Sequence, residues 1–223
     1  FRRVLFRSQY LEPFLRNFPG KKLIVSESTS ALMTRGYYEM PSDHIYIRPE
    51  SWDKPFEAPE HVCSSYDNCH VPWGSTHEKT WHLVRTLPHV SGLFVWTGFD
   101  YLGEPTPYWW PSRSSFFGIV DLAGFPKDVY YMYKSEWTDE PVLHIFPHWN
   151  WKEGEPVDIW GYYNNADEVE LYLNGKSLGV RQKTDSTYHV SWRVPFTPGT
   201  LKAVSRLGGK EVLVKEIHTA GEP

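Results

Sequence analysis

The chain has 223 residues, of which 40% are hydrophobic, and a formal net charge of −4. This length is enough for one large domain or two modest ones, each with its own hydrophobic core. The negative charge argues against nucleic acid and anionic membrane surfaces as partners. No apolar run approaches the roughly 20 residues that a membrane span requires. The sequence therefore predicts a globular protein with no nucleic-acid partner and no membrane span.

Aromatic residues are unusually frequent, with 11 Trp, 14 Tyr and 12 Phe, or 17% of the chain. They fit two interpretations. Aromatic rings build large cores and tight β packing, and they also stack on the C–H faces of sugar rings. The 18 prolines and 16 glycines indicate many loops and turns rather than a helical bundle.

The first eight residues, F-R-R-V-L-F-R-S, contain no apolar core of the kind found in signal peptides, and the chain has no initiating methionine. We expect residues 1–8 to be a non-native leader and the native sequence to start in the middle of a protein.

A helix is predicted over residues 9–18, where aromatic and leucine side chains recur with helical spacing. Pro19-Gly20 ends it. The apolar run 23–25 leads to Ser26-Glu27 and predicts a buried parallel strand.

Residues 28–74 lack periodicity but are rich in aromatic residues, which indicates a long ordered loop. Ser75 and Glu78 form a capping-box pattern that predicts a helix from about 76 to 87, with Ser75 as the N-cap. Residues 91–96 predict a second buried strand. Helix, strand, long loop, helix and strand in this order are typical of a parallel α/β barrel.

A second loop is expected at 97–127 and a final helix at 128–137. After residue 140 the hydrophobic period becomes two, which favours β-strands. Asn174-Gly175 predicts a type I′ hairpin, and Gly208-Gly209 predicts another turn. Several short strands at this spacing favour an immunoglobulin-like β-sandwich.

The predicted fold class is therefore α/β plus all-β. Residues 9–140 are expected to form part of a (β/α)8 TIM barrel, namely its last two strand–helix units, because a whole barrel needs about 250 residues. Residues 141–223 are expected to form the immunoglobulin-like β-sandwich.

Glu27 lies at the carboxyl end of the first predicted strand, where barrel enzymes place their catalytic groups. A carboxylate there is either catalytic or a structural ion-pair partner. Trp96 ends the next predicted strand and is either a sugar platform or a cap on the core. Because neighbouring strands lie about 4.8 Å apart, Glu27 and Trp96 can share one pocket. Asp100 follows Trp96 in the same loop.

Five stretches carry a family resemblance: K-L-I-V-S-E-S-T-S-A at 22–31, W-G-S-T-H-E at 73–78, S-G-L-F-V-W-T-G-F-D-Y-L-G-E-P-T-P-Y at 91–108, S-R-S-S-F-F-G-I-V-D-L-A-G-F-P-K-D at 112–128 and E-V-E-L-Y-L-N-G-K-S-L-G at 168–179. Together they make residues 9–223 resemble glycoside hydrolase family 2. The likeness is to β-galactosidase-type members of polysaccharide-degrading bacteria, and to the end of their TIM barrel plus the immunoglobulin-like domain that follows.

The resemblance implies a fragment of a retaining exo-glycosidase that hydrolyses terminal β-galactosides. Glu27 matches the nucleophile, Trp96 matches the tryptophan that lines the sugar subsite, and Asp100 matches a nearby acidic residue that contacts substrate. The implied partners are a carbohydrate with a terminal β-linked sugar and the missing N-terminal domains of the same polypeptide.

One part of the family pattern is absent. The general acid/base glutamate of the family follows an asparagine upstream of the nucleophile, and no Asn-Glu pair precedes Glu27 in this sequence. A retaining enzyme needs its two carboxyl groups about 5–5.5 Å apart. We therefore expect the acid/base residue to lie outside this chain and the chain alone to be inactive.

Two alternatives remain. One is another activity of the same family, β-glucuronidase or β-mannosidase. Asn150-Trp151-Lys152 matches an Asn-x-Lys pattern of the family's β-glucuronidases, but it lies at the start of the predicted sandwich and is interpreted as a chance match. The other alternative is a non-catalytic carbohydrate-binding or structural module.

No metal and no cofactor are expected, because Cys63, Cys69, His70 and His77 have no metal-ligand spacing. The two cysteines are either free thiols or a small local disulfide, and free thiols are favoured. The sequence leaves open the sugar, the linkage, the oligomeric state and the cellular location, although the resemblance is compatible with a periplasmic or secreted protein.

Overall fold

A computed structural model describes residues 11–51 and 61–221 of the chain. The leader predicted at residues 1–8 lies outside the described residues. The chain divides into two compact units, residues 1–129 and 130–223, and the division falls within helix α3. The domain boundaries predicted from the sequence stay a prediction.

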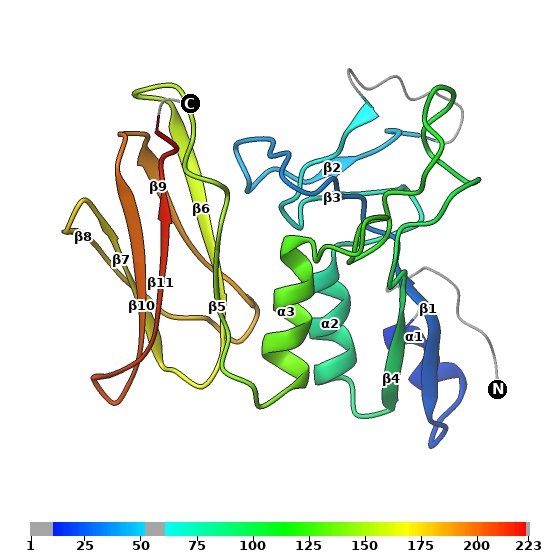
Figure 1. Cartoon of the computed structure of the whole chain (residues 1–223). Coiled ribbons are helices and arrows are strands. Elements are labelled where there is room, and N and C mark those ends of the chain that lie inside the picture. The colour runs from blue at the N-terminus through cyan, green and yellow to red at the C-terminus, as the bar shows by residue number, and fades with distance from the viewer. Residues whose placement is uncertain (1–10, 52–60, 222–223) are drawn as a thin grey trace. The chain divides into compact units, whose positions relative to one another are not determined.

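The first unit contains helices, one pair of long strands and one pair of very short strands (Figure 1). Its elements are α1 (Leu11–Asn17), β1 (Leu23–Thr29), β2 (Tyr46–Ile47), β3 (Cys69–His70), α2 (His77–Thr86), β4 (Val90–Trp96) and the start of α3 (Asp128–Trp137).

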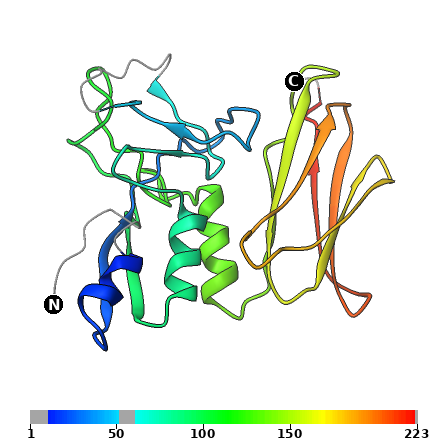
Figure 2. The same cartoon turned by 180° about the vertical axis from the view of Figure 1, so that it is seen from behind.

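The second unit is built mainly of strands, and Figure 2 shows them from behind. Its strands are β5 (Leu143–Phe146), β6 (Pro156–Tyr163), β7 (Glu168–Leu173), β8 (Lys176–Arg181), β9 (Val190–Pro195), β10 (Thr200–Leu207) and β11 (Lys210–His218).

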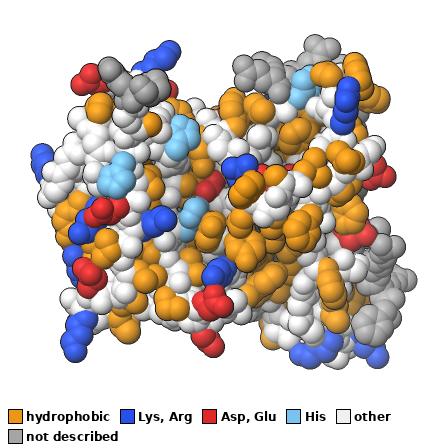
Figure 3. Space-filling view, viewed as in Figure 1, with side chains coloured by type: hydrophobic (Ala, Val, Ile, Leu, Met, Phe, Trp, Pro, Cys, Tyr) orange, Lys and Arg blue, Asp and Glu red, His pale blue; other side chains and the backbone are white. Residues whose placement is uncertain are grey.

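Strands β1 and β4 pair in parallel, which confirms the two strands predicted from their apolar runs. One face of the pair is buried: Leu23 and Val25 pack against Val84 of α2, with Leu93 beside them. The other face is open. Ile24 is 39% exposed and Phe94 66% exposed, and orange side chains reach the surface of this unit in Figure 3.

The predicted long loop between β1 and α2 is ordered where the structure describes it. It contributes β2 and β3, which pair in parallel, and Leu32, Cys63 and Val71 are buried together in one hydrophobic cluster. Residues 52–60 of this predicted loop lie outside the described residues.

Helix α2 confirms the predicted helix, but its N-cap is Thr76 rather than Ser75. The Thr76 hydroxyl accepts a hydrogen bond from the Lys79 N–H. Both carboxylate oxygens of the buried Asp67 accept hydrogen bonds from the first turn, at His77 N (2.8 Å) and Glu78 N (2.7 Å). The capping-box prediction at Ser75 is wrong, because this distant carboxylate satisfies the helix N-terminus and the Ser75 hydroxyl bonds to Thr80 instead.

The second unit contains two antiparallel sheets, with strand orders β11-β10-β7-β8 and β5-β6-β9. Alternate residues of β9 are buried, as its sequence predicts. Asn174 and Gly175 both have positive φ, 50° and 80°, in the hairpin that joins β7 to β8. This confirms the predicted type I′ turn, which requires positive φ at both central residues.

The described residues therefore form a mostly β structure with few helices. None of the helices within residues 11–51 and 61–221 combines the length and the apolar character that crossing a membrane would need.

Candidate active site

Glu27 lies in a β-bulge near the carboxyl end of β1. Val25 pairs with Leu93 and Ser28 pairs with Val95. Between these two pairs, β1 therefore contains one residue more than β4. A bulge bends its strand and redirects the side chains within it, and such bulges are frequent next to active sites. The Glu27 side chain is half-buried. Because of the bulge, the Glu27 side chain does not have to follow the regular alternation of side chains between the two faces of the strand.

Trp96 is the last residue of β4 and is the Cα partner of Thr29, the last residue of β1. Its half-buried ring meets the Tyr101 ring edge to face, with ring centroids 5.9 Å apart. Trp96 and Tyr101 both pack against the hydrophobic cluster that contains Tyr108. The peptide bond between Trp96 and Thr97 is cis. One side of the tryptophan is therefore fixed by aromatic packing.

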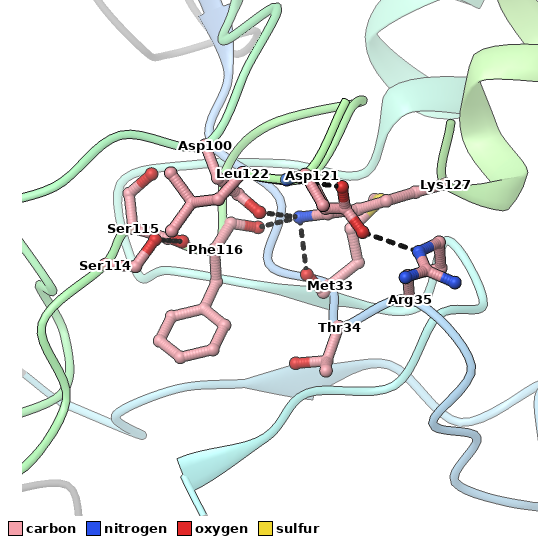
Figure 4. A pocket seen from close by; sticks show the side chains of 11 residues that line it. Met33, Thr34, Arg35, Asp100, Ser114, Ser115, Phe116, Asp121, Leu122 and Lys127 are labelled. Carbon is pink, nitrogen blue, oxygen red and sulfur yellow. Dashed lines mark hydrogen bonds and ion pairs between the residues drawn. The ribbon is translucent and has the colours of Figure 1, made fainter. Parts of the chain in front are cut away.

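Asp100 forms an ion pair with a buried lysine (Figure 4). Its Oδ2 lies 2.7 Å from Lys127 Nζ, and its Oδ1 accepts a hydrogen bond from Gly118 N at 2.8 Å. Lys127 Nζ also donates to the carbonyl oxygens of Met33 (2.8 Å) and Phe116 (3.4 Å). The lysine side chain is 1% exposed and the aspartate side chain 9% exposed. Both carboxylate oxygens of Asp100 are therefore engaged within the protein.

Burial opposes the charge on both members of this pair. Desolvation lowers the pKa of Lys127 and raises that of Asp100, while the attraction between the two groups acts in the opposite direction on each. Lys127 ties the segment after β1, through Met33, to the loop after β4, through Phe116. Lys127 was not predicted to be a site residue, although it lies in the F-P-K-D stretch of the family resemblance.

A pocket of about 350 Å³ lies beside the Asp100–Lys127 pair. Arg35 and Asp121, which also form an ion pair, line it together with Phe116 (Figure 4). The Asp121 carboxylate accepts hydrogen bonds from the N–H groups of Ala123 and Phe125 in its own turn. Burial is the largest single effect and raises the pKa of Asp121, but the hydrogen bond and charge of Arg35 together with the two backbone hydrogen bonds outweigh it and hold the pKa below its usual value. Asp121 thus has a structural role in the turn.

Two cysteines and a tyrosine form a buried cluster behind Trp96. Cys63 and Cys69 are free and buried. Cys63 Sγ lies 2.6 Å from the Tyr108 hydroxyl, which donates to the Val62 carbonyl oxygen at 2.8 Å. The hydrogen bond from Cys63 and burial raise the pKa of Cys69 well above its ordinary value. The thiols therefore belong to the packing of the cluster.

The structure brings the backbones at Glu27 and Trp96 to the same edge of one parallel sheet. That their side chains share one sugar pocket stays a prediction, as do the substrate-binding role of Trp96 and that of Asp100. Asn150 lies in the second unit, where its Oδ1 accepts a hydrogen bond from Ala220 N. Across the part of the chain that the structure describes, no three His, Cys, Asp or Glu side chains are grouped so as to hold a metal ion.

Comparison with known proteins identifies relatives along most of the chain. The family described as a domain of unknown function, DUF4982, matches residues 154–213. The chain is 64% identical over 207 residues to beta-galactosidase BoGH2A of Bacteroides ovatus, covering 93% of this chain and 24% of that protein. It is 30% identical over 218 residues to a beta-glucuronidase of Formosa agariphila, covering 95% of this chain and 21% of that protein.

Solved structures agree with these relatives. A beta-glycosidase from Bacteroides vulgatus matches 99% of this chain and 31% of its own length, with 33% identity and a TM-score of 0.85. A glycosyl hydrolase family 2 member from Bacteroides cellulosilyticus matches 99% of this chain and 25% of its own length, with 25% identity and a TM-score of 0.64. The chain spans about a quarter of the length of the curated relatives that it matches. It belongs to glycoside hydrolase family 2.

Proposed function

We propose that this chain is the part of a retaining β-galactosidase that carries the nucleophile, Glu27, and a wall of the sugar subsite, Trp96. The Glu27 carboxylate attacks the anomeric carbon and forms a C–O bond, while an acid/base residue outside this chain protonates the departing oxygen. Water, deprotonated by the same acid/base residue, then breaks the glycosyl–enzyme bond and restores both groups. The anomeric configuration is retained because each step inverts it.

The observation that carries the proposal is the position of Glu27. It lies in a bulge near the carboxyl end of a parallel strand, beside a second parallel strand that ends in Trp96. The carboxyl ends of parallel barrel strands form the active-site face. A carboxylate next to an aromatic ring suits a sugar, because the ring faces the pyranose and the carboxylate meets the positive charge that develops at the anomeric carbon.

We further propose that the first unit is the last part of a (β/α)8 barrel and the second an immunoglobulin-like sandwich. The open face of β1 and β4 supports the first assignment, because Ile24 and Phe94 are large apolar side chains that a complete barrel would cover. The two antiparallel sheets of the second unit support the second. On this proposal the chain alone is inactive.

The test is Glu27→Gln in the full-length parent protein, assayed with an aryl β-galactoside. The amide has nearly the same shape but cannot act as the nucleophile, so kcat is expected to fall by at least about 10³-fold, by analogy with removal of an essential nucleophile elsewhere. Glu153→Gln, at an exposed position in the second unit, is the matched control and should leave kcat unchanged. Near-parental turnover by the Glu27 variant would rule the assignment out.

The alternative sugars are separated by substrate. Relatives named beta-glucuronidase support that alternative, and β-mannosidase is the other member of the same family to compare. Comparing the kcat/KM of the full-length parent on an aryl β-galactoside, β-glucuronide and β-mannoside shows which sugar it prefers. A glucuronide preferred over the galactoside by tenfold or more would replace β-galactosidase with β-glucuronidase, and the role of Glu27 would stand.

A non-catalytic module is the remaining alternative, in which the second unit binds carbohydrate or only supports structure. Limited proteolysis of the 223-residue chain followed by mass spectrometry distinguishes it. Survival of residues 130–223 alone, with no activity in the full-length parent, would favour this alternative.

A further inference from the structure

We propose that Gly74 is a positioning residue for Glu27, and that it acts through a strained turn directly after the nucleophile. This inference rests on the proposed function of Glu27. It concerns two short segments: residues 28–30, called here the γ-turn, and the backbone of residues 71–75, called here the clamp.

The γ-turn has a backbone conformation that its residues do not favour. Thr29 has φ of 77° and Ser30 has φ of 56°, and Ser30 N donates to the Ser28 carbonyl oxygen at 3.1 Å. A hydrogen bond between residues two apart, around a centre with positive φ, is the rare and strained form of a γ-turn. Positive φ is a genuine outlier for a β-branched residue such as threonine. Such a conformation persists only where its surroundings impose it.

The surroundings that impose it belong to the clamp. Ser75 N donates to the Thr29 carbonyl oxygen at 2.7 Å, and Val71 N donates to the Ser30 carbonyl oxygen at 3.3 Å. The Ser30 side chain is fully buried, and its hydroxyl has no hydrogen-bond partner among the residues that the structure describes. Backbone contacts from the clamp therefore hold the γ-turn.

Gly74 permits this close approach. A Cβ at this position would lie 2.5 Å from the Thr29 carbonyl oxygen and 2.7 Å from the Ser30 carbonyl oxygen. Both distances are far below normal van der Waals contact, and both partners are backbone atoms that cannot rotate away. Any side chain at 74 must push the γ-turn and the clamp apart.

The clamp is held in place by hydrogen bonds within it and at the start of α2. Gly74 N donates to the Val71 carbonyl oxygen at 2.8 Å, and the next residues enter helix α2, whose first turn is held by Asp67. Displacement caused by a methyl group at 74 therefore falls largely on the γ-turn. The γ-turn begins one residue after Glu27, so its displacement moves the nucleophile.

The experiment measures the attack step alone. The full-length parent and its Gly74→Ala variant are treated with 2-deoxy-2-fluoro-β-galactosyl fluoride, from which the Glu27 oxygen displaces fluoride at the anomeric carbon. The resulting covalent adduct is followed by intact mass. We expect kinact to fall about 100-fold, the cost of misplacing a reacting group by about 1 Å, while Ki changes less than threefold.

Gly161→Ala is the matched control for general destabilisation. It lies on β6 in the second unit, where a Cβ would also be crowded, 3.3 Å from Val190 Cγ2. A merely structural loss lowers the melting temperature of both variants without lowering kinact at temperatures where both are folded. A kinact for Gly74→Ala within threefold of that of Gly161→Ala would overturn the proposal.

A double variant covers the case in which Gly74→Ala does not fold. In Gly74→Ala/Ser30→Gly the glycine at 30 lets the γ-turn move away from the new methyl group, so folding should be recovered and kinact should stay about 100-fold low. Parental kinact in a folded double variant would also overturn the proposal. If Glu27→Gln forms no adduct but Gly74→Ala forms it at the parental rate, the proposed function is supported and the role of Gly74 is wrong. If Glu27→Gln still forms the adduct, the proposed function itself is wrong.

Discussion

Thr29 and Trp96, the last residues of β1 and β4, are Cα partners in the parallel pairing of these strands. The two strands therefore end level with each other. Everything proposed for the active site depends on this register, because it places the bulge that contains Glu27 and the tryptophan at one edge of the sheet.

Replacement of Trp96 tests the sugar platform. Loss of an aromatic face that buries one side of the substrate is worth about 1.5–3 kcal/mol, or about 10–140-fold in kcat/KM. We expect Trp96→Ala in the full-length parent to show this loss on an aryl β-galactoside. Trp96→Phe keeps a ring and should retain most of the activity. Unchanged kinetics in the alanine variant would show that the tryptophan only caps the core.

The buried ion pair between Asp100 and Lys127 should be costly to break. Lys127→Met leaves the Asp100 carboxylate with a single backbone partner at Gly118, so the free energy of unfolding should fall by about 3–5 kcal/mol. Urea titration followed by tryptophan fluorescence measures it.

Two further variants make that result specific. Lys134→Met breaks a solvent-exposed pair with Glu140 and should cause no measurable loss. The double variant Lys127→Met/Asp100→Leu should recover part of the stability, because an apolar pair no longer buries an unpaired charge. Equal losses at Lys127 and Lys134 would contradict the role assigned to burial.

We expect His77 to make the first unit sensitive to acid. Burial, with Lys127 nearby, lowers the pKa of His77 from 6.5 to about 3. Between these pH values the unfolded chain binds a proton that the folded chain excludes. The neutral histidine therefore makes its full contribution to the free energy of unfolding above pH 6.5. This contribution is lost as the pH falls toward 3, by about 1.4 kcal/mol per pH unit.

This pH dependence is measured by urea unfolding between about pH 7 and pH 5, where most carboxylates remain charged. In His77→Phe the slope over this window should flatten, since the ring no longer titrates. His44→Gln, at an exposed position, keeps the slope. A slope that survives in His77→Phe would assign the acid sensitivity to other groups.

The cysteines should be unreactive while the protein is folded. Cys63 and Cys69 are each 2% exposed, and the hydrogen bond from Cys63, with burial, raises the pKa of Cys69. Because the thiolate is the nucleophile, iodoacetamide at pH 8 should add to neither thiol in the native chain and to both after denaturation in urea. Intact mass detects each addition. Rapid alkylation of the native chain, or loss of two hydrogens through a disulfide, would contradict the structure.

Local sequence patterns were sufficient to predict the elements with strong local signals. The apolar runs predicted β1 and β4, the helical stripe and Pro19-Gly20 predicted α1, and Asn174-Gly175 predicted a hairpin turn. These features depend on the spacing of apolar residues along the chain and on residues that readily adopt positive φ. Both can be recognised from residues that are close together in the sequence. The residues around Glu27 and Trp96 also carried the family resemblance that the relatives bear out.

The details around Glu27 depend on contacts that form only in the folded chain. The bulge at 26–27 depends on how β1 pairs with β4, and the carbonyl oxygen of Thr29, a residue with positive φ, accepts a hydrogen bond from Ser75 N in the clamp. Asp67, ten residues before α2 begins, accepts a hydrogen bond from the first turn of that helix. Lys127 likewise meets Met33 and Asp100 only after folding. Such contacts join groups far apart in the chain, and backbone strain of this kind is stable only inside a packed structure. No local pattern in the sequence could reveal them.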